Sequence, residues 1–132
     1  FPPSDAFPLE EWKHIPSYLL FVNGKPAGSM ALAFHKYWDW NSNEYVSAPG
    51  CLYIASTGIL PPYQGQGWGR FLKAWQVSYA KKHGYKRIKI TTRESNVRMI
   101  RLNKSFGFKV VGNISSAYKC PHERGVDMEL VF

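Results

Sequence analysis

The chain has 132 residues, 45% of them hydrophobic and 16% aromatic, and it carries a net charge of +8 at pH 7. This composition is typical of one folded domain and excludes a disordered chain, and no apolar run reaches the ~18 residues that a membrane-spanning helix needs. We therefore expect a single domain over residues 1–132. The positive charge favours an anionic partner, which leaves nucleic acid, an acidic surface and a phosphorylated cofactor open beside a merely solubilising role.

The N-terminal sequence, FPPSDAFPLEEW, lacks the basic-then-apolar pattern of a signal peptide and does not begin with methionine. We expect a chain that was trimmed or excised from a longer one, and a cytoplasmic location. The two cysteines, Cys51 and Cys120, allow one disulfide. Free thiols are favoured, because a domain of this size needs no covalent cross-link.

The first half of the chain predicts three strands. Asn23-Gly24 is a strong hairpin-turn signal between two apolar stretches, and a third stretch, rich in apolar and β-branched residues, ends at Pro61-Pro62. The predicted elements are strands at 17–22, 26–38 and 51–60, with a polar, aromatic-rich loop at 39–50.

In the second half, the apolar residues first recur at helical spacing and then alternate as in a half-buried strand. Gly84 stops the first helix, and Ser95 and Gly107 cap the second. The order β-β-β-α-β-α-β-β predicts a mixed α/β domain with a helix-bearing crossover after the third strand. The predicted elements are helices at 67–84 and 95–107 and strands at 85–92, 108–115 and 125–132, the last two paired.

The turn Tyr63–Arg70, YQGQGWGR, joins the third strand to the first helix. Its glycines let the main chain approach a ligand, and the N–H groups of a first helical turn point outward with the helix dipole behind them. Arg70 adds a cation. The spacing is neither the G-x-G-x-x-G of dinucleotide sites nor the G-K-[ST] ending of nucleotide-triphosphate loops. From these residues alone, a phosphate site and an ordinary loop both remain open.

Two motifs occur together in the chain. The segment ILPPYQGQGWGRFL carries Q-x-x-G-x-G at Gln64, Gly67 and Gly69, and NVRMIRLNKSFGF is similar to N-x-x-A-x-x-L-Y-x-K-x-G-F. With the DMELVF ending, these motifs resemble the GNAT superfamily of acyl-CoA-dependent N-acyltransferases over residues 17–132. The resemblance implies a GNAT-like, mixed but mostly antiparallel central sheet, splayed between the third and fourth strands and flanked by helices. It also implies that the family's N-terminal strand and helix are short or absent, with residues 1–16 as the remnant of the acceptor-side segment.

The resemblance implies that acetyl-CoA is the cosubstrate. In the family, the Q-x-x-G-x-G turn binds the pyrophosphate through main-chain N–H groups, and the preceding strand holds the pantetheine arm and the thioester at a bulge, expected here at Gly58. An asparagine of the second motif contacts the cofactor near the pantetheine. Carried over to this sequence, the cofactor-binding residues are Gly58, Ile59, Leu60, Pro61, Gln64, Gly65, Gln66, Gly67, Trp68, Gly69, Arg70, Asn96 and Asn103.

One position departs from the family pattern. Where the family usually has a tyrosine that protonates the leaving thiolate, this chain has Asn103, whose amide donates a hydrogen bond but cannot act as a general acid. Ser105 is an alternative donor.

The acceptor amine also needs a base or a water relay, for which Glu44 and Tyr53 are candidates, and an ordinary surface or packing role stays open for each. Further positions expected beside the splay are His35, Asp39, Ser56, Thr57 and Glu94.

Three other segments have plain alternatives. The aromatic loop at 35–45 either forms an acceptor pocket or covers the sheet edge. The CPHE segment at 120–123 lacks a second ligand pair, so no metal is expected. The basic residues at 81–89 are expected to form a solvated face rather than a nucleic-acid footprint.

The sequence therefore predicts an N-acetyltransferase that moves an acetyl group from acetyl-CoA to a primary amine of an unidentified acceptor by direct attack. The alternative is a catalytically degenerate GNAT-fold module that binds CoA, nucleic acid or a protein partner. An acidic or nucleic-acid-linked acceptor fits the charge, no membrane partner is expected, and the flank left open by the short N-terminal segment favours a homodimer.

Overall fold

The computed structural model describes residues 16–119 and 122–132. In this part of the chain, a six-stranded sheet with strand order β1-β2-β3-β4-β6-β5 packs against two α-helices. Only β3 and β4 are parallel neighbours, which confirms the predicted mixed, mostly antiparallel sheet. The β1–β2 turn is at Asn23-Gly24, where both residues have the positive φ of the turn that Asn-Gly favours. The elements are β1 (Ser17–Val22), β2 (Lys25–Asp39), β3 (Glu44–Ile59), the 3₁₀ helix η2 (Pro61–Tyr63), α2 (Trp68–Lys82), β4 (Arg87–Arg93), α3 (Val97–Ser105), β5 (Lys109–Lys119) and β6 (His122–Val131).

β2 and β3 form a hairpin that is longer than the sequence predicts. β2 ends at Asp39 and β3 begins at Glu44, so β3 covers most of the segment 39–50, which was predicted as a loop. That prediction was wrong because aromatic residues pair across the hairpin. Trp38 and Tyr45 are directly opposite in the ladder, and their rings pack edge to face with centroids 5.1 Å apart. Such cross-strand pairs stabilise a sheet even where the surrounding residues are polar.

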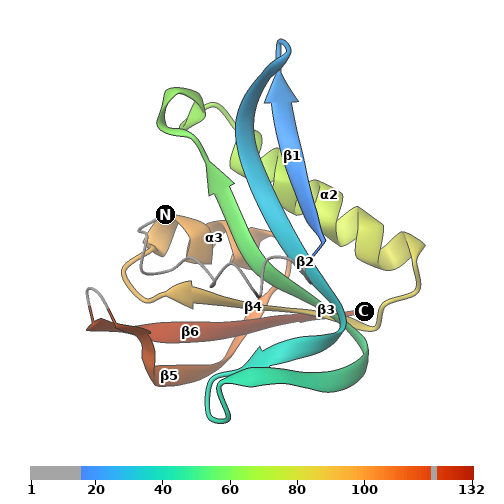
Figure 1. The fold of residues 1–132 in the computed structure, drawn as a ribbon, viewed down its shortest axis with the longest axis vertical. Helices are drawn as coiled ribbons and strands as arrows, with labels where there is room; N and C mark the ends of the chain where they lie inside the picture. The colour runs from blue at the N-terminus through green and yellow to red at the C-terminus, as the bar shows by residue number, and fades with distance from the viewer. Residues whose placement is uncertain (1–15, 120–121) are drawn as a thin grey trace.

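β3 separates from β4 partway along its length. The two strands pair as far as Ile54 and Ile90, although each continues beyond that point. At Ala55, the register of β3 against β2 shifts by one residue. Such a bulge bends and twists its strand, and Figure 1 shows β3 diverging from β4. The predicted splay is confirmed. The predicted bulge at Gly58 is wrong, because Gly58 pairs in register and the extra residue is Ala55.

The helix ends follow from their cap residues. Gly67, with φ of 91°, is the N-cap of α2, and Gly84, with φ of 75°, follows its last turn. Asn96 is the N-cap of α3, because its side-chain oxygen accepts a hydrogen bond from a main-chain N–H of the first turn at 3.2 Å. The prediction of Ser95 as that cap was wrong. The Ser95 N–H donates instead to the carboxylate of Glu123 on β6.

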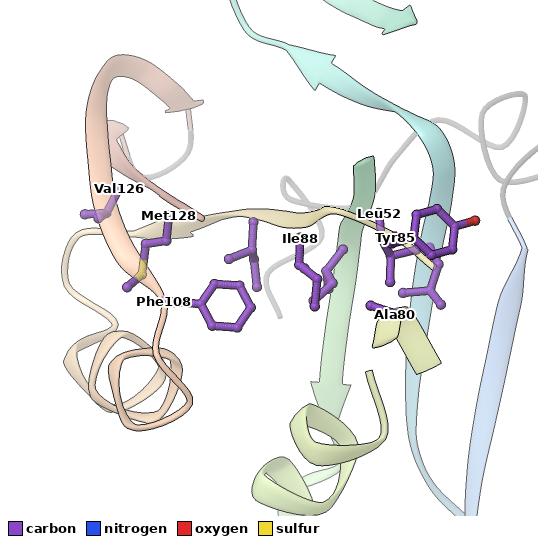
Figure 2. Close-up of a cluster of buried hydrophobic side chains, with 10 residues drawn as sticks. Leu52, Ala80, Tyr85, Ile88, Phe108, Val126 and Met128 are labelled. Atoms are coloured by element: carbon purple, nitrogen blue, oxygen red, sulfur yellow. The ribbon is translucent and has the colours of Figure 1, made fainter. Parts of the chain in front are cut away.

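The core lies between the sheet and the two helices. Leu52, Ile88 and Met128 come from three neighbouring strands and pack with Ala80 of α2 and with Phe108, which follows α3 (Figure 2). The core therefore joins the strands on both sides of the splay to both helices. Neither described helix is long and apolar enough to cross a bilayer.

Candidate active site

The glycine turn forms a main-chain concavity at the start of α2. Gly65 and Gly67 have φ of 75° and 91°, and a Cβ added to either would meet no atom within 4 Å, so both face open space. The first main-chain bond of α2 runs from the Phe71 N–H to the Gly67 carbonyl at 3.0 Å. The N–H groups of the preceding turn therefore have no acceptor inside the helix, and they face outward with the positive end of the helix dipole, which is the arrangement that binds a phosphate.

Two glutamine side chains hold the turn in place. Gln64 Nε2 donates to the Ile59 carbonyl at 2.8 Å, and Gln66 Nε2 donates to the Pro62 carbonyl at 3.0 Å. The first bond links the turn to the last residue of β3 and the second links it to η2, so the concavity is fixed relative to the end of the splayed strand.

The first turn of α2 also contacts α3. A Cβ at Gly69 would lie 3.9 Å from Leu102 Cδ2, so the two helices are in van der Waals contact there. The Arg70 guanidinium lies 3.4 Å from Ser105 Oγ, to which it donates, and 5.2 Å from the centroid of the Phe106 ring. These contacts place a cation beside the glycine turn and face it toward α3.

The end of β3, the glycine turn and α3 enclose a cleft of about 780 Å³, which we call the anion cleft. On α3, residues Arg98, Arg101, Leu102 and Ser105 line it, at the i, i+3, i+4 and i+7 spacing of a single helix face. Three guanidinium groups line the cleft, and no carboxylate of the described residues does. The lining residues are Thr57, Gly58, Ile59, Tyr63, Gln64, Gly65, Gly67, Trp68, Gly69, Arg70, Asn96, Arg98, Met99, Arg101, Leu102 and Ser105.

Most of the predicted cofactor residues meet in this cleft. Those that line it are Gly58, Ile59, Gln64, Gly65, Gly67, Trp68, Gly69, Arg70 and Asn96, whereas Leu60, Pro61, Gln66 and Asn103 do not. Arg98 and Arg101 also line the cleft, although neither is among the predicted site residues. Their spacing of three residues on a predicted helix is the signal that places both on one face.

A second cavity, of about 270 Å³, opens within the splay between β3 and β4, and we call it the splay cavity. The rings of Trp40, Tyr53 and Tyr118 line it together with main-chain and hydroxyl groups of both strands. One residue of the predicted aromatic loop, Trp40, thus reaches this cavity, where its Nε1 donates to Thr91 Oγ1 at 3.3 Å.

The two cavities adjoin each other. Thr57, Asn96 and Met99 line both of them. A ligand that starts in the anion cleft and follows the end of β3 therefore arrives at the splay.

Two groups of the splay cavity are constrained by their surroundings: burial keeps the Tyr53 phenol protonated, and an ion pair fixes the Arg93 guanidinium. Tyr53 is 3% exposed, and burial raises its pKa far above its usual range, so it stays protonated. Arg93 pairs with Glu123 at 3.1 Å, and its guanidinium carbon lies 4.5 Å from the centroid of the Tyr118 ring. The cavity thus offers hydrogen-bond donors and aromatic surface.

Asn103 and Ser105, the predicted donors to the leaving thiolate, are placed differently. Asn103 is fully buried, its Nδ2 donates to Met128 Sδ at 3.6 Å, and it lines neither cavity. Ser105 lines the anion cleft, where its Oγ donates to the Leu102 carbonyl and accepts from Arg70. The structure therefore brings Ser105 to the arginine-bearing cleft and leaves Asn103 in the core.

Of the candidates for removing a proton from the amine, some line the splay cavity and others line neither cavity. Tyr53, Ser56 and Thr57 line the splay cavity, while His35, Asp39, Glu44 and Glu94 line neither cavity. Glu44 is exposed at the start of β3, next to the turn of the long hairpin. Among the described residues, no carboxylate and no imidazole lines either cavity.

The remaining predictions concern segments away from the cavities. Within the basic run 81–89, Arg87 pairs with Glu129 at 2.8 Å and Lys89 with Asp127 at 3.3 Å, so part of this charge is neutralised. Cys51 is a buried free thiol. Residues 1–15 and 120–121, which include Cys120 and all but Pro16 of the predicted N-terminal remnant, lie outside the described residues. Within the described residues, no three or more His, Cys, Asp and Glu side chains form a group that could hold a metal ion.

Comparison with known proteins agrees with this geometry. A family model, the acetyltransferase (GNAT) family, matches residues 1–108. No curated protein matches the sequence.

Solved structures share the fold at low identity. An IAA acetyltransferase from Bacillus cereus superposes with a TM-score of 0.75 at 16% identity, covering 91% of this chain and 79% of its own. The ribosomal-protein-S18-alanine N-acetyltransferase of Escherichia coli has a TM-score of 0.73 at 23% identity, with 96% and 79% covered. A Bacillus subtilis acetyltransferase in complex with CoA has a TM-score of 0.75 at 18% identity, with 93% and 80% covered. The family model covers well over half of the chain and the fold agrees, so the chain belongs to the GNAT family of acetyl-CoA-dependent acetyltransferases.

Proposed function

We propose that this chain transfers the acetyl group of acetyl-CoA to a primary amine by direct attack. The observation that carries the proposal is the junction at Thr57, Asn96 and Met99, where the anion cleft adjoins the splay cavity. A cofactor whose pyrophosphate occupies the glycine turn then extends along the end of β3 and presents its thioester at the splay.

The main chain of β3 supports this course for the cofactor. The Leu60 N–H donates to the Ala27 carbonyl of β2 at 2.8 Å. Because the bonding direction alternates along an antiparallel ladder, the main-chain groups of Thr57 and Ile59 turn away from β2 and toward the splay. The Ile59 carbonyl accepts there from Gln64. We assign Thr57 to the pantetheine amides and the thioester carbonyl, where an N–H donor would stabilise the developing oxyanion.

The reaction also removes two protons from a protonated primary amine: one before attack, because only the neutral amine is nucleophilic, and one from its nitrogen as the amide forms. The amine nitrogen forms a bond to the thioester carbon, and the tetrahedral intermediate collapses by breaking the carbon–sulfur bond and releasing the CoA thiolate. Both protons leave through water positioned by Ser56 and Thr57, since these are hydroxyl-bearing residues of the splay cavity and no described carboxylate lines it. Tyr53 binds its proton too tightly to give it to a thiolate, so its role is to donate a hydrogen bond.

The size of the splay cavity favours a compact acceptor. Its volume of about 270 Å³ and its aromatic side admit one small amine or the end of a larger molecule. The name of the Escherichia coli structure denotes an enzyme that acts on an alanine of a ribosomal protein, so the α-amine of a peptide belongs in the first screen, beside small amines and amines linked to acidic macromolecules. We also infer a cytoplasmic location, which the free thiol of Cys51 supports.

The test begins with a calorimetric titration of the protein with acetyl-CoA. We expect micromolar binding that is lost in a Gly67→Trp variant, because an indole at this position would project into the open concavity. Far-UV circular dichroism of the variant controls for folding.

Turnover is then measured as release of free CoA thiol in the presence of each candidate amine. Amine-dependent release, with an N-acetylated product seen by mass spectrometry, would support the proposal. Absence of acetyl-CoA binding to the intact chain at millimolar concentration would overturn it.

A further inference from the structure

We propose that Gln76 of α2 is a positioning residue of the active site. Its buried amide orients the hydroxyl of Thr57, so that this hydroxyl donates a hydrogen bond to the thioester carbonyl of the bound acyl-CoA. The inference rests on the proposed function, because it adds a residue to the same reaction. It gives a role in the reaction to a core side chain that lines neither cavity.

The first observation is the position of Gln76. Its side chain is fully buried on the inward face of α2. Its Nε2 donates to Thr57 Oγ1 at 3.1 Å and to Met30 Sδ at 3.4 Å. Thr57 and Met30 are directly opposite each other in the β2–β3 ladder, so their side chains are on the same face of the sheet. Gln76 therefore links α2 to the splayed strand β3 at the residue where the two cavities adjoin.

The second observation is the direction of these hydrogen bonds. A thioether sulfur can only accept a hydrogen bond, so Met30 requires the amide nitrogen of Gln76, rather than its oxygen, on the side that faces β2 and β3. Thr57 Oγ1 lies on the same side of the amide and therefore accepts. The hydroxyl of Thr57 consequently keeps its own hydrogen for a different partner.

The third observation is the cost of burying this amide. Gln76 Oε1 has no hydrogen-bond partner among the described residues. An unpaired buried carbonyl lowers the free energy of unfolding, and an apolar side chain of similar volume, such as methionine, would avoid this loss. Of the two groups that the amide contacts, only Thr57 lines a cavity. A role at Thr57 therefore accounts for a polar residue that packing alone does not require.

The hydroxyl of Thr57 is in a position to meet the ligand. Of Thr57, Asn96 and Met99, which line both cavities, only Thr57 carries a hydroxyl. A hydroxyl has one hydrogen and two lone pairs, and Gln76 occupies one lone pair. The hydrogen then bonds the thioester carbonyl, and the second lone pair accepts from the water that removes protons from the amine. A donor that is held in place before charge develops stabilises the oxyanion without a cost of reorganisation.

The experiment measures how strongly the protein distinguishes a carbonyl from a methylene group. Acetyl-CoA and S-ethyl-CoA, which has a methylene in place of the thioester carbonyl, are titrated by calorimetry into the wild type, Gln76→Met, Thr57→Val and the double variant. Thr57→Ser keeps the hydroxyl and is the rescue variant. Lys73→Met is the matched control, because Lys73 is another buried polar residue of the inward face of α2, lines neither cavity, and has an Nζ without a hydrogen-bond partner among the described residues.

We expect the wild type, Thr57→Ser and Lys73→Met to prefer acetyl-CoA over S-ethyl-CoA by a similar factor. Gln76→Met and Thr57→Val should each lower this preference by about threefold or more, which corresponds to the loss of one hydrogen bond. Their affinity for S-ethyl-CoA should stay within about twofold of the wild type. The double variant should discriminate as Thr57→Val does, because Gln76 acts through Thr57.

Several results would overturn the role of Gln76 and leave the proposed function standing. They are equal affinity of the wild type for the two ligands, an undiminished preference in Gln76→Met or Thr57→Val, and an equal loss of affinity for both ligands in Gln76→Met. A double variant that discriminates less than Thr57→Val would do the same, since Gln76 would then act by another route. Binding of neither ligand to the wild type would overturn the proposed function and the inference with it.

Discussion

Three polar side chains are buried in the layer between the sheet and the helices. Lys73 and Gln76 belong to the inward face of α2 and Asn103 to α3, and none is more than 1% exposed. Lys73 Nζ, Gln76 Oε1 and Asn103 Oδ1 have no hydrogen-bond partner among the described residues. Nζ of Lys73 lies 5.4 Å from the centroid of the Phe108 ring. Because burying unpaired polar atoms costs free energy, these residues limit the stability of the domain.

Lys73 makes the stability depend on pH. Burial lowers the pKa of Lys73 from its usual 10.5 to about 7 in the folded state. Between these values the unfolded chain binds more protons than the folded one, so the free energy of unfolding rises with pH from about 7 to about 10.5, by at most about 1.4 kcal/mol per pH unit. A Lys73→Met variant should lose this slope and be more stable at pH 7 by roughly 2–4 kcal/mol. Urea unfolding at several pH values from 6.5 to 9.5 measures both effects.

Lys82→Met is the matched control, since Lys82 is an exposed lysine of the same helix. It should keep the slope of the wild type and change the stability at pH 7 by less than about 0.5 kcal/mol. Equal slopes in the wild type and Lys73→Met would show that Lys73 stays protonated and solvated in the folded state.

Asn103 occupies the sequence position of the family's usual tyrosine, but the structure places it in the core. Its side chain is buried against Met128 and lines neither cavity. We expect Asn103→Leu to keep kcat within about twofold and to leave the free energy of unfolding equal or about 1 kcal/mol higher, because the unpaired Oδ1 is removed.

Tyr53→Phe, which removes a hydroxyl from the splay cavity, should lower kcat at unchanged affinity for acetyl-CoA. Steady-state kinetics of both variants decide the matter, and a tenfold loss of kcat in Asn103→Leu would assign a catalytic role to Asn103.

At the scale of an element, one residue of α3 has both a structural role and a place in the site. Asn96 caps the helix and also lines both cavities. Asn96→Ala should lower the free energy of unfolding by about 1 kcal/mol through loss of the cap. Asn96→Asp should keep that stability, since aspartate caps equally well, but should weaken acetyl-CoA binding by several fold because it places a negative charge beside the anion cleft.

Thermal unfolding and calorimetry on the two Asn96 variants separate these roles. If Asn96→Asp binds acetyl-CoA as tightly as the wild type, the cofactor does not pass Asn96. If Asn96→Ala is as stable as the wild type, the cap contributes nothing measurable to the fold.

The bounds of an element could be predicted from the sequence where a short local pattern determines the backbone conformation. The Asn-Gly turn and the glycines that bound α2 each depend on a backbone conformation that few residues adopt, so their positions were correct. The long hairpin could not be predicted, because the pairing of Trp38 with Tyr45 joins residues on two different strands. The bulge at Ala55 was missed for a similar reason, since it is set by the register against β2 and by the loss of pairing with β4 rather than by a glycine. Most of the predicted cofactor residues that meet in the anion cleft come from one short stretch, residues 58–70, whereas the splay cavity combines Trp40, Tyr53 and Tyr118 from distant segments.

At the scale of the whole molecule, the sheet consists of two halves with a short seam. The strands β1, β2 and β3 form one half and β4, β6 and β5 the other. The main-chain pairing between them runs along Cys51–Ile54 and Arg87–Ile90, and one further bond joins the Lys86 N–H to the Gly50 carbonyl at 2.8 Å. Beyond that seam, side chains of the core pack the two halves together. At the open end, residues of both halves line the two cavities. A ligand that contacts β3 on one side and α3 on the other therefore bridges them.

This architecture predicts how acetyl-CoA stabilises the protein. A ligand that binds only the folded state adds about 2.7 kcal/mol to the free energy of unfolding at one hundred times its dissociation constant. Because the ligand would bridge the splay, hydrogen exchange should slow in the first turns of both α2 and α3 and at the end of β3, and not merely in the glycine turn. Gly67→Trp should abolish the protection at all three places together. Protection confined to α2 would mean that the ligand occupies the glycine turn without entering the splay, and the thioester would then lie outside the splay cavity in which we place the reaction.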